Sequence, residues 1–335
     1  MTITLLDRYK GAMVGVLVGD AIGAPYETWG PTKIAADIEA RGGLTFFDYE
    51  NPWKHELGPK ILPAGRPTDD SDQTADLAES LIACNGLDIE HLREALRDSV
   101  VRHESRLWNG TALGAGGTTK KALSDDPDKV AEAMNNNIGT NGSLMRSVPM
   151  ALWLQGKMHF DLIPNMENEQ GVWEHTSPLE LIRKMSAVTH AHTHAIEACL
   201  FYSWCMNLIL TNTDGPKPLH ENMRPVGPVS HRVISRLSDC YDHPYDPGAW
   251  PARGTAEFSL YVALWCFKHS TSFADGIEKA VRIGGDTDTY AAIAGGLLGA
   301  YYGYDAIPLE WRQTILGHDV MVEYADKLYE MNQQL

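Results

Sequence analysis

Two short clusters of oxygen-bearing side chains have the composition of a metal site. One is GGDTDT at residues 284–289, and the other is PTDDSDQT at residues 67–74. Apolar residues with helical spacing follow each cluster, so we expect each at a helix start, where the helix dipole and free N–H groups favour acids. Helix capping would explain either cluster alone, but two clusters facing each other across a cleft would offer only hard oxygen ligands, which select hard cations. The oxygen-bearing side chains are Asp286, Asp288 and Thr289 in one cluster and Thr68, Asp69, Asp70, Ser71 and Asp72 in the other.

Glu27 is a candidate of another kind, an acid that follows a Gly-rich helical segment. Pro25 ends that segment, so Glu27 is expected at the exit of the helix. An acid in this position is a helix cap, a partner in a buried ion pair, or a site residue that helps to activate water. The local sequence leaves these three interpretations open.

A Gly-rich segment at residues 111–123 could let the backbone approach a phosphate group. It contains Gly114, Gly116 and Gly117, and backbone N–H groups at such a turn can bind anions. The segment lacks the GxxxxGKS/T pattern of a phosphate-binding loop, and no predicted strand precedes it. A lone Gly-rich segment is a weak signal, and a flexible turn is a more common explanation of it than a phosphate site.

Two further polar segments deserve a structural and a functional interpretation. NGSLMR at 141–146 predicts a tight turn that leads into a helix over 144–154, with Ser143 as a natural N-cap. THAHTH at 189–194 contains three histidines at alternate positions. This spacing does not converge three imidazoles on one ion, so a zinc site is disfavoured. A single histidine that binds a ligand or caps a helix is the preferred interpretation.

Composition limits the classes of function. The chain has 335 residues and a formal net charge of −16, which opposes binding to nucleic acid or an anionic membrane. We find no secretory signal peptide and no apolar run near the length of about 20 residues that a membrane helix needs. The five cysteines include no CxxC pair, which favours a reducing cytoplasm over a disulfide framework.

The apolar periodicity predicts a mostly or wholly α-helical fold, and the length allows one large domain or two. Gly11, Gly15 and Gly19 recur on one helix face, where a neighbouring backbone could come close. Residues 30–67 and 212–253 are rich in proline and are expected to be loops or lids, the first with a short hairpin near 44–49. Helices are expected over residues 3–28, 72–84, 88–104, 144–154, 178–211 as two helices, 254–268, 273–282, 286–302 and 308–333.

Five motifs in one order resemble those of the ADP-ribosylglycohydrolase family, which includes the dinitrogenase-reductase-activating glycohydrolase and the arginine- and serine-directed ADP-ribosylhydrolases. They are GDAIGAPYE (19–27), PTDDSDQT (67–74), NGSLMR (141–146), TH (189–190) and GGDTDT (284–289). The resemblance implies a compact, orthogonal all-α bundle in a single domain over residues 1–335, with a central cleft for two divalent metals, Mg²⁺ or Mn²⁺. It also implies hydrolysis of the glycosidic bond between ADP-ribose and an acceptor.

The resemblance assigns roles to individual residues. Glu27 matches an acid at the cleft mouth. The residues that match the family's metal ligands are Thr68, Asp69, Asp70, Asp286, Asp288 and Thr289. Either Glu27 or an acid of the first cluster, Asp69 or Asp70, would act as the catalytic base. The residues expected to bind ADP-ribose are Gly114, Gly116, Asn141, Gly142, Ser143 and His190.

Two departures from the family pattern bear on the substrate. Ser71 replaces a threonine and keeps the hydroxyl, so it should be tolerated. Ile138 and Gly139 stand where serine-directed members carry polar and aromatic residues. An ADP-ribosylated arginine of a protein is therefore the expected substrate. The alternatives are a small ADP-ribose or nucleoside derivative, or a non-catalytic binding or structural protein on the same fold.

Overall fold

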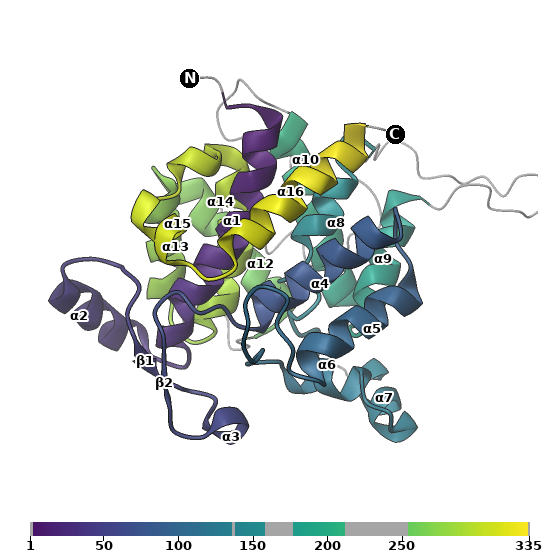
Figure 1. Ribbon diagram of the computed structural model, residues 1–335, viewed down its shortest axis with the longest axis horizontal. Helices are drawn as coiled ribbons and strands as arrows, with labels where there is room; N and C mark the ends of the chain where they lie inside the picture. The colour runs from purple at the N-terminus through teal and green to yellow at the C-terminus, as the bar shows by residue number, and fades with distance from the viewer. Residues whose placement is uncertain (1–2, 136–137, 158–176, 212–253, 334–335) are drawn as a thin grey trace, which may run out of the picture.

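The structure is a computed structural model that describes residues 3–135, 138–157, 177–211 and 254–333. These residues form helices joined by short loops, with one small sheet, as Figure 1 shows. The all-α prediction is confirmed. The elements are α1 Leu5–Gly23, η1 Ala24–Tyr26, α2 Pro31–Arg41, β1 Tyr49–Glu50, α3 Lys54–Leu57, β2 Ile61–Leu62, α4 Asp69–Ala83, α5 Ile89–Val100, α6 Gly117–Ala122, α7 Pro127–Met134, α8 Val148–Trp153, α9 Pro178–Ala187, α10 Thr193–Thr211, α12 Ala256–His269, α13 Phe273–Arg282, α14 Thr287–Tyr302, η2 Tyr304–Ala306, α15 Leu309–Thr314 and α16 His318–Gln333.

Helices α1 and α14 form an antiparallel pair in the core, and almost every side chain of both is buried. Their backbones touch along a stripe of small residues, as the glycine spacing predicted. A Cβ built on Gly15 would lie 2.2 Å from the carbonyl oxygen of Gly295, and one built on Gly19 would lie 2.0 Å from that of Ala291. Because the pair is antiparallel, the C-terminal end of α1 lies beside the N-terminal end of α14.

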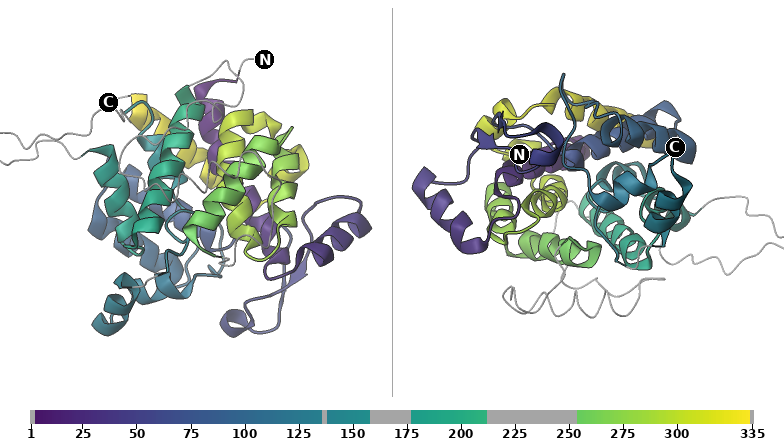
Figure 2. Two further views of the ribbon diagram at one scale, coloured as in Figure 1. Left: turned by 180° about the vertical axis from the view of Figure 1, so that it is seen from behind. Right: turned by 90° about the horizontal axis from the view of Figure 1, so that it is seen from below.

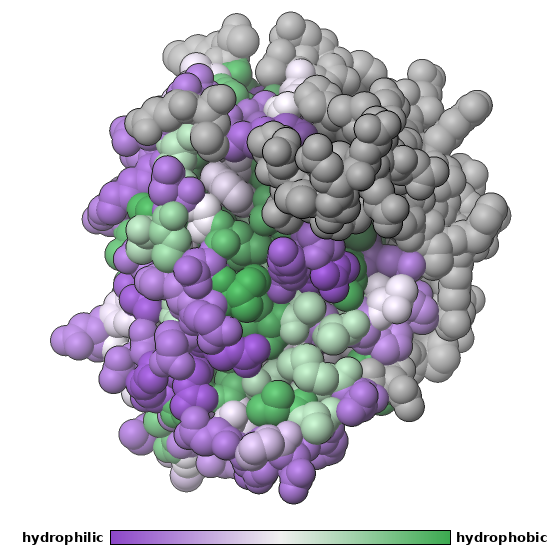
Figure 3. Space-filling view, turned by 90° about the vertical axis from the view of Figure 1, so that its right-hand side faces the viewer, coloured by the Kyte–Doolittle hydropathy of each residue, from purple (hydrophilic) through white to green (hydrophobic). Residues whose placement is uncertain are grey.

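Other helices surround this pair. Helix α16 packs across α1, α4 and α8, while α10, α12 and α13 pack against α14 (Figures 1 and 2). Peripheral helices such as α5 bury one face and expose charged side chains on the other. Hydrophilic residues accordingly cover much of the face in Figure 3, with hydrophobic residues between them. Within the described residues, no helix combines the length and the apolar character needed to cross a membrane.

The segment 30–67 differs from the expected loop. It contains the helix α2, which begins at Pro31 and ends before Gly42, a residue in the left-handed region. Its strands β1 and β2 pair antiparallel, with Tyr49 opposite Leu62, so the expected hairpin lies later in the chain than predicted. Together α2, α3 and the two strands project from the bundle (Figure 2).

Two helix boundaries also correct the prediction. The helix expected over 144–154 begins only at Val148, because residues 141–146 form turns. The helix expected over 308–333 is two helices, α15 and α16, and Gly317 with a φ of +86° lies between them. The expected lid at 212–253 lies outside the described residues.

Candidate active site

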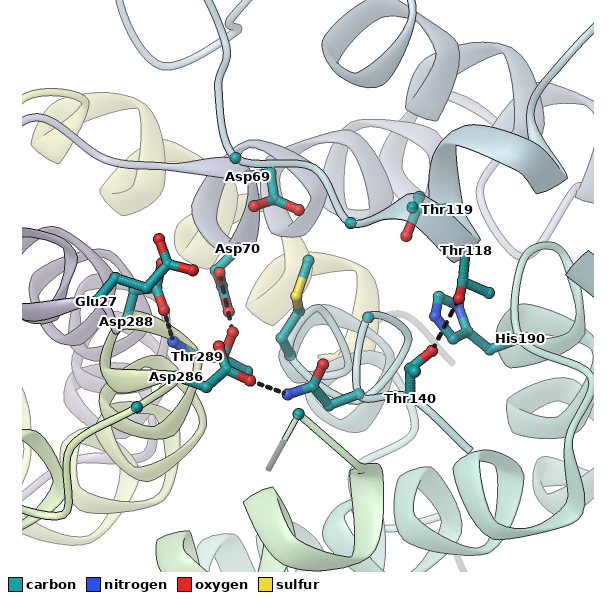
Figure 4. A pocket seen from close by; sticks show the side chains of 18 of the residues that line it. Glu27, Asp69, Asp70, Thr118, Thr119, Thr140, His190, Asp286, Asp288 and Thr289 are labelled. Atoms are coloured by element: carbon teal, nitrogen blue, oxygen red, sulfur yellow. Dashed lines mark hydrogen bonds between the residues drawn. The ribbon is translucent and has the colours of Figure 1, made fainter. Parts of the chain in front are cut away.

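A polar cleft of about 550 Å³ opens where the ends of α1, α4 and α14 meet. In Figure 4 acidic side chains gather on one side of it, and His190 with three threonines occupies the other. The volume lies within the range of small-molecule and cofactor sites. Its lining comprises Glu27, Thr28, Asp69, Asp70, Gly114, Gly116, Gly117, Thr118, Thr119, Thr140, Asn141, Gly142, Met145, His190, Gly254, Gly285, Asp286, Asp288 and Thr289.

The contact between α1 and α14 brings three acids together at one end of the cleft. Glu27 follows η1 at the exit of α1, Asp286 stands at the N-cap position of α14, and Asp288 lies in its first turn. One carboxylate oxygen from each lies within 4.8 Å of the others. Glu27, expected at the cleft mouth, therefore lies beside the second acid cluster.

The first acid cluster faces the cleft from the start of α4. Asp69 and Asp70 line the cleft, whereas Thr68 is fully buried behind them. The Thr68 hydroxyl donates to Asp20 Oδ1 at 2.5 Å, and the backbone N–H groups of Thr68 and Ser71 donate to Asp20 Oδ2 at 2.9 and 3.0 Å. Asp20 therefore fixes the first turn of α4. Sequence reasoning gave Asp20 no role at the site, although it lies within the first of the five motifs.

Burial makes this concentration of acids electrostatically unfavourable without a cation. It raises the pKa of Asp69, Asp70 and Asp288 well above the usual range, and the negative charge of neighbouring acids adds to the effect. Burial likewise raises the pKa of Glu27, to about 8, with Asp286 the main neighbouring charge. A bound cation would reverse these shifts, because it favours the ionised form of each acid.

The donor set fits one or more hard divalent cations. The Oδ1 atom of Asp70 is buried without a hydrogen-bond partner, which is costly for a carboxylate unless another group binds it. Thr289 Oγ1 lies 3.5 Å from the other oxygen of Asp70, so the two predicted clusters meet. Carboxylate and hydroxyl oxygens without thiolate suit Mg²⁺ or Mn²⁺.

The Gly-rich segment closes over the first acid cluster. Gly114 has a φ of +99°, and a Cβ there would lie 2.8 Å from Asp69 Oδ1, so glycine is needed for both reasons. Glu56 of α3 accepts a hydrogen bond from the Gly114 N–H at 3.0 Å and pairs with Lys120. A Cβ on Gly116 would meet no atom within 4 Å, so the loop leaves open space there. The projecting segment thus anchors the loop that covers the cleft.

Asn141 contacts the acidic end of the cleft, and the neighbouring Gly142 packs against His190 at the other end. The Asn141 side-chain amide donates to Asp286 Oδ2 at 2.7 Å and to Ser259 Oγ at 2.9 Å. A Cβ on Gly142 would lie 2.7 Å from His190 Cε1, so only glycine lets the turn pack on this imidazole.

Not every predicted ligand-binding residue lines the cleft. Ser143 is fully buried behind it, where its hydroxyl accepts a hydrogen bond from Ser186 at 2.8 Å. It is not a helix N-cap either, since Ser147 occupies that position for α8.

The three histidines at 189–194 separate, as their spacing indicated. His190 faces the cleft, whereas the rings of His192 and His194 pack edge to face 4.8 Å apart. His194 Nδ1 lies 3.3 Å from Glu257.

Several cleft residues were not predicted from the sequence. Thr118 and Thr119 follow the Gly-rich run directly, and Thr140 precedes Asn141, so closeness to a predicted motif was the available signal. Their hydroxyl-bearing side chains provide hydrogen-bonding groups on the side of the cleft away from the acids (Figure 4).

Comparisons with known proteins point to one family. The chain matches the family model described as ADP-ribosylglycohydrolase over residues 1–335. It is 26% identical over 329 residues to the ADP-ribosylarginine hydrolase Tri1 of Serratia proteamaculans, covering 97% of this chain and 80% of that one. It is 26% identical to the ADP-ribosyl-dinitrogen reductase glycohydrolase of Rhodospirillum rubrum, covering 95% and 92% of the two chains. A solved structure, an ADP-ribosylglycohydrolase-related protein complex, matches with a TM-score of 0.69 and 27% identity over 98% of this chain and 99% of that one.

An all-helical bundle with this acidic cleft, together with these similarities, defines a glycohydrolase enzyme. The chain belongs to the ADP-ribosylglycohydrolase family. The resemblance inferred from five ordered motifs is therefore confirmed, and with it an activity on glycosidic bonds of ADP-ribose.

Proposed function

We propose that this enzyme hydrolyses the N-glycosidic bond between ADP-ribose and an arginine side chain, with two Mg²⁺ or Mn²⁺ ions bound in the cleft. The observation that carries the proposal is the convergence of Glu27, Asp286 and Asp288 within 4.8 Å, opposite the acids of α4. The names of the Serratia and Rhodospirillum relatives support the proposal, since one acts on ADP-ribosylarginine and the other on an ADP-ribosylated protein.

The two acid clusters would hold the cations. Thr68 would act through its backbone position and its contact with Asp20, since its hydroxyl is engaged there. When bound, such cations lower the pKa of a coordinated water and stabilise negative charge on oxygen. The residues that would bind the cations through their side chains are Asp69, Asp70, Asp286, Asp288 and Thr289.

The remaining cleft residues would orient the substrate and handle the proton. Glu27 is half-buried beside Asp286 and Asp288, where it can accept a proton from the attacking water or pair with the departing guanidinium. Asn141 fixes Asp286. His190, on the side of the cleft away from the acids, would donate a hydrogen bond to the ADP-ribose (Figure 4). The loop at Gly114 and Gly116 would lie over the diphosphate, with its backbone N–H groups available to bind oxygen.

Release of ADP-ribose from defined substrates tests the proposal. Metal-stripped protein should release ADP-ribose from an ADP-ribosyl-arginine peptide after addition of Mg²⁺ or Mn²⁺, but not with EDTA, and Zn²⁺ should restore little activity. Full turnover in chelator after exhaustive dialysis would refute the role of metal. Turnover of small ADP-ribose derivatives only would move the substrate to the small-molecule class.

A further inference from the structure

A buried chain of hydrogen bonds runs behind the cleft wall from Asp69 to His190. Gln73 Nε2 donates to Asp69 Oδ2 at 2.7 Å, and Arg146 Nη1 donates to Gln73 Oε1 at 2.8 Å. Arg146 Nη2 donates to Thr189 Oγ1 at 2.7 Å, and that oxygen lies 2.7 Å from His190 Nδ1. All five residues are more than nine-tenths buried. The chain thus connects the acidic end of the cleft with its other end.

The chemistry of the guanidinium fixes the direction of the first bonds. Arginine can only donate hydrogen bonds, so Gln73 must turn its carbonyl oxygen to Arg146 and its NH₂ group to Asp69. Asp69 Oδ2 is then engaged, and Oδ1 remains on the side of Gly114 at the cleft. Gln73 therefore selects which carboxylate oxygen is available to a cation.

The hydrogen bonds of Thr189 likewise determine which ring nitrogen of His190 carries the proton. Thr189 Oγ1 accepts from Arg146 and has one proton to donate. Among the described residues, the other partner recorded for this hydroxyl is His190 Nδ1, so Thr189 donates to Nδ1 and the imidazole proton resides on Nε2. Burial, with the charge of Arg146, lowers the pKa of His190 to about 3, so the ring is neutral near pH 7.

Arg146 is well held for such a role. Its side chain is fully buried, and Nη1 also donates to the Gly142 carbonyl at 3.1 Å, while Nε has no partner among the described residues. A buried charge is costly to maintain unless it is hydrogen-bonded, and the partners of both Nη atoms belong to or contact the cleft wall.

We propose that Arg146 is a positioning residue for both ends of the cleft: through Gln73 it orients Asp69, and through Thr189 it holds His190 as a neutral Nε2–H donor to the ligand. The identity of the ligand, ADP-ribose, rests on the proposed function. Which nitrogen of His190 carries the proton does not depend on the proposed function, and it can be measured without substrate.

Thr189→Val and Thr189→Ser form a matched pair that tests the hydrogen bonds from Arg146 through Thr189 to His190. Two-dimensional ¹H–¹⁵N NMR of histidine-labelled protein, assigned with His190→Gln, should find Nε2 protonated in the wild type and in Thr189→Ser. In Thr189→Val the Nδ1–H form should become populated. The Kd of ADP-ribose should rise about fivefold to tenfold in Thr189→Val, as for the loss of one oriented hydrogen bond, while the Kd of Mn²⁺ changes less than twofold.

Gln73→Met tests the hydrogen bonds from Arg146 through Gln73 to Asp69. It is also the control for Thr189→Val, because it should affect the metal and not His190. It should weaken Mn²⁺ binding about tenfold or more, in line with other residues that orient metal ligands, and leave the His190 tautomer unchanged. The proposal would be overturned if the His190 tautomer were unchanged in Thr189→Val. It would also be overturned if both variants weakened the binding of ADP-ribose and of Mn²⁺ equally, because Arg146 would then have only a structural role. A tautomer shift in protein that binds no ADP-ribose would support the positioning role and refute the proposed function instead.

Discussion

At the scale of single residues, the proposed cation site buries acids that destabilise the metal-free protein. Asp70 and Asp288 are buried with raised pKa, and Asp70 Oδ1 has no hydrogen-bond partner. Like charges at this spacing destabilise the metal-free protein. A bound cation would convert the same cluster into a stabilising one, because ligands that bind only the folded state add to its stability.

Asp70→Asn and Asp288→Asn should each lower turnover of ADP-ribosyl substrate by about 100-fold or more, because each removes a charged cation ligand while preserving the side-chain volume. The melting temperature of the metal-free variants should rise, since repulsion is relieved. Steady-state kinetics with Mg²⁺ and thermal unfolding in EDTA measure the two effects.

Asp72→Asn provides the matched control for these variants. Asp72 lies on the same turn of α4 as Asp70 and is equally buried, and like Asp70 it has one hydrogen-bonded oxygen and one without a partner among the described residues, but it does not line the cleft. Turnover should stay within about threefold of wild type. Near wild-type activity in Asp70→Asn and Asp288→Asn would contradict the assignment of ligands.

The pH dependence of stability should report on Glu27. In the metal-free protein its pKa is raised to about 8. Between the unfolded value and about 8 the folded protein binds a proton that the unfolded chain has released, so the free energy of unfolding falls as pH rises over this interval. Glu27→Gln cannot ionise, so its melting temperature in EDTA should fall less between pH 5 and pH 8. Parallel curves for the two proteins would contradict the raised pKa.

Residues near a recognisable local pattern could be predicted from the sequence, and isolated ones could not. Both acid clusters precede apolar helical runs, so their place at helix starts was readable. Asp20 is one acid within an apolar helix, and its partner Thr68 is distant in the chain. Gln73 and Arg146 act through tertiary contacts that no local spacing reveals.

At the scale of elements, the contact of α1 with α14 sets the position of the acids. Gly23 of α1 approaches the start of α14, where a Cβ would lie 2.4 Å from the Thr287 carbonyl oxygen. Sliding one helix along the other would therefore move Glu27 relative to Asp288. The tight packing of backbone on backbone resists this movement, since close-packed interiors tolerate little change in volume.

Gly19→Ala should test this packing. Its Cβ would lie 2.0 Å from the Ala291 carbonyl oxygen, a backbone atom that cannot move without shifting α14. We expect the free energy of unfolding to fall by about 3 kcal/mol, although alanine is the better helix former at an unconstrained position. Affinity for cations should fall as well. Urea unfolding and Mn²⁺ titration measure these effects.

Gly30→Ala is the control for that substitution. Gly30 lies at the N-cap position of α2 with a φ of −83°, and a Cβ there would meet no atom within 4 Å. Its free energy of unfolding should change by less than about 0.5 kcal/mol. Equal effects from the two substitutions would show that close helix approach is not what Gly19 provides.

Helices could be predicted where apolar or small residues repeat on one helix face. They were harder to predict in segments dominated by proline and glycine. The glycine spacing of α1 indicated a close neighbour without identifying α14. Helix α2 buries only Ile34 and Ile38, so its periodic signal was weak, although Pro31 and Gly42 mark its two ends. The strands β1 and β2 have two residues each, too few for an alternating pattern.

At the scale of the whole molecule, charge bears on the choice of substrate. The net charge of −16 favours approach of a cationic group, and Glu27, which is not assigned to a cation, extends that preference into the site. An arginine leaving group carries a guanidinium, whereas a serine leaving group is neutral. Ile138 is 60% exposed and Gly139 has no side chain, so this position offers no polar or aromatic pair before Asn141.

ADP-ribosyl-arginine should therefore be hydrolysed at least about tenfold faster than ADP-ribosyl-serine at saturating Mg²⁺ and moderate salt. That ratio corresponds to about 1.4 kcal/mol in the barrier. The part that comes from long-range attraction should shrink in kcat/KM as ionic strength rises, because salt screens exposed charges, while the part that comes from Glu27 and its neighbours should persist. Peptides that differ only in the modified residue, assayed across a salt series, separate the two parts. Equal rates, or a preference for serine, would remove the arginine assignment and leave the glycohydrolase activity in place.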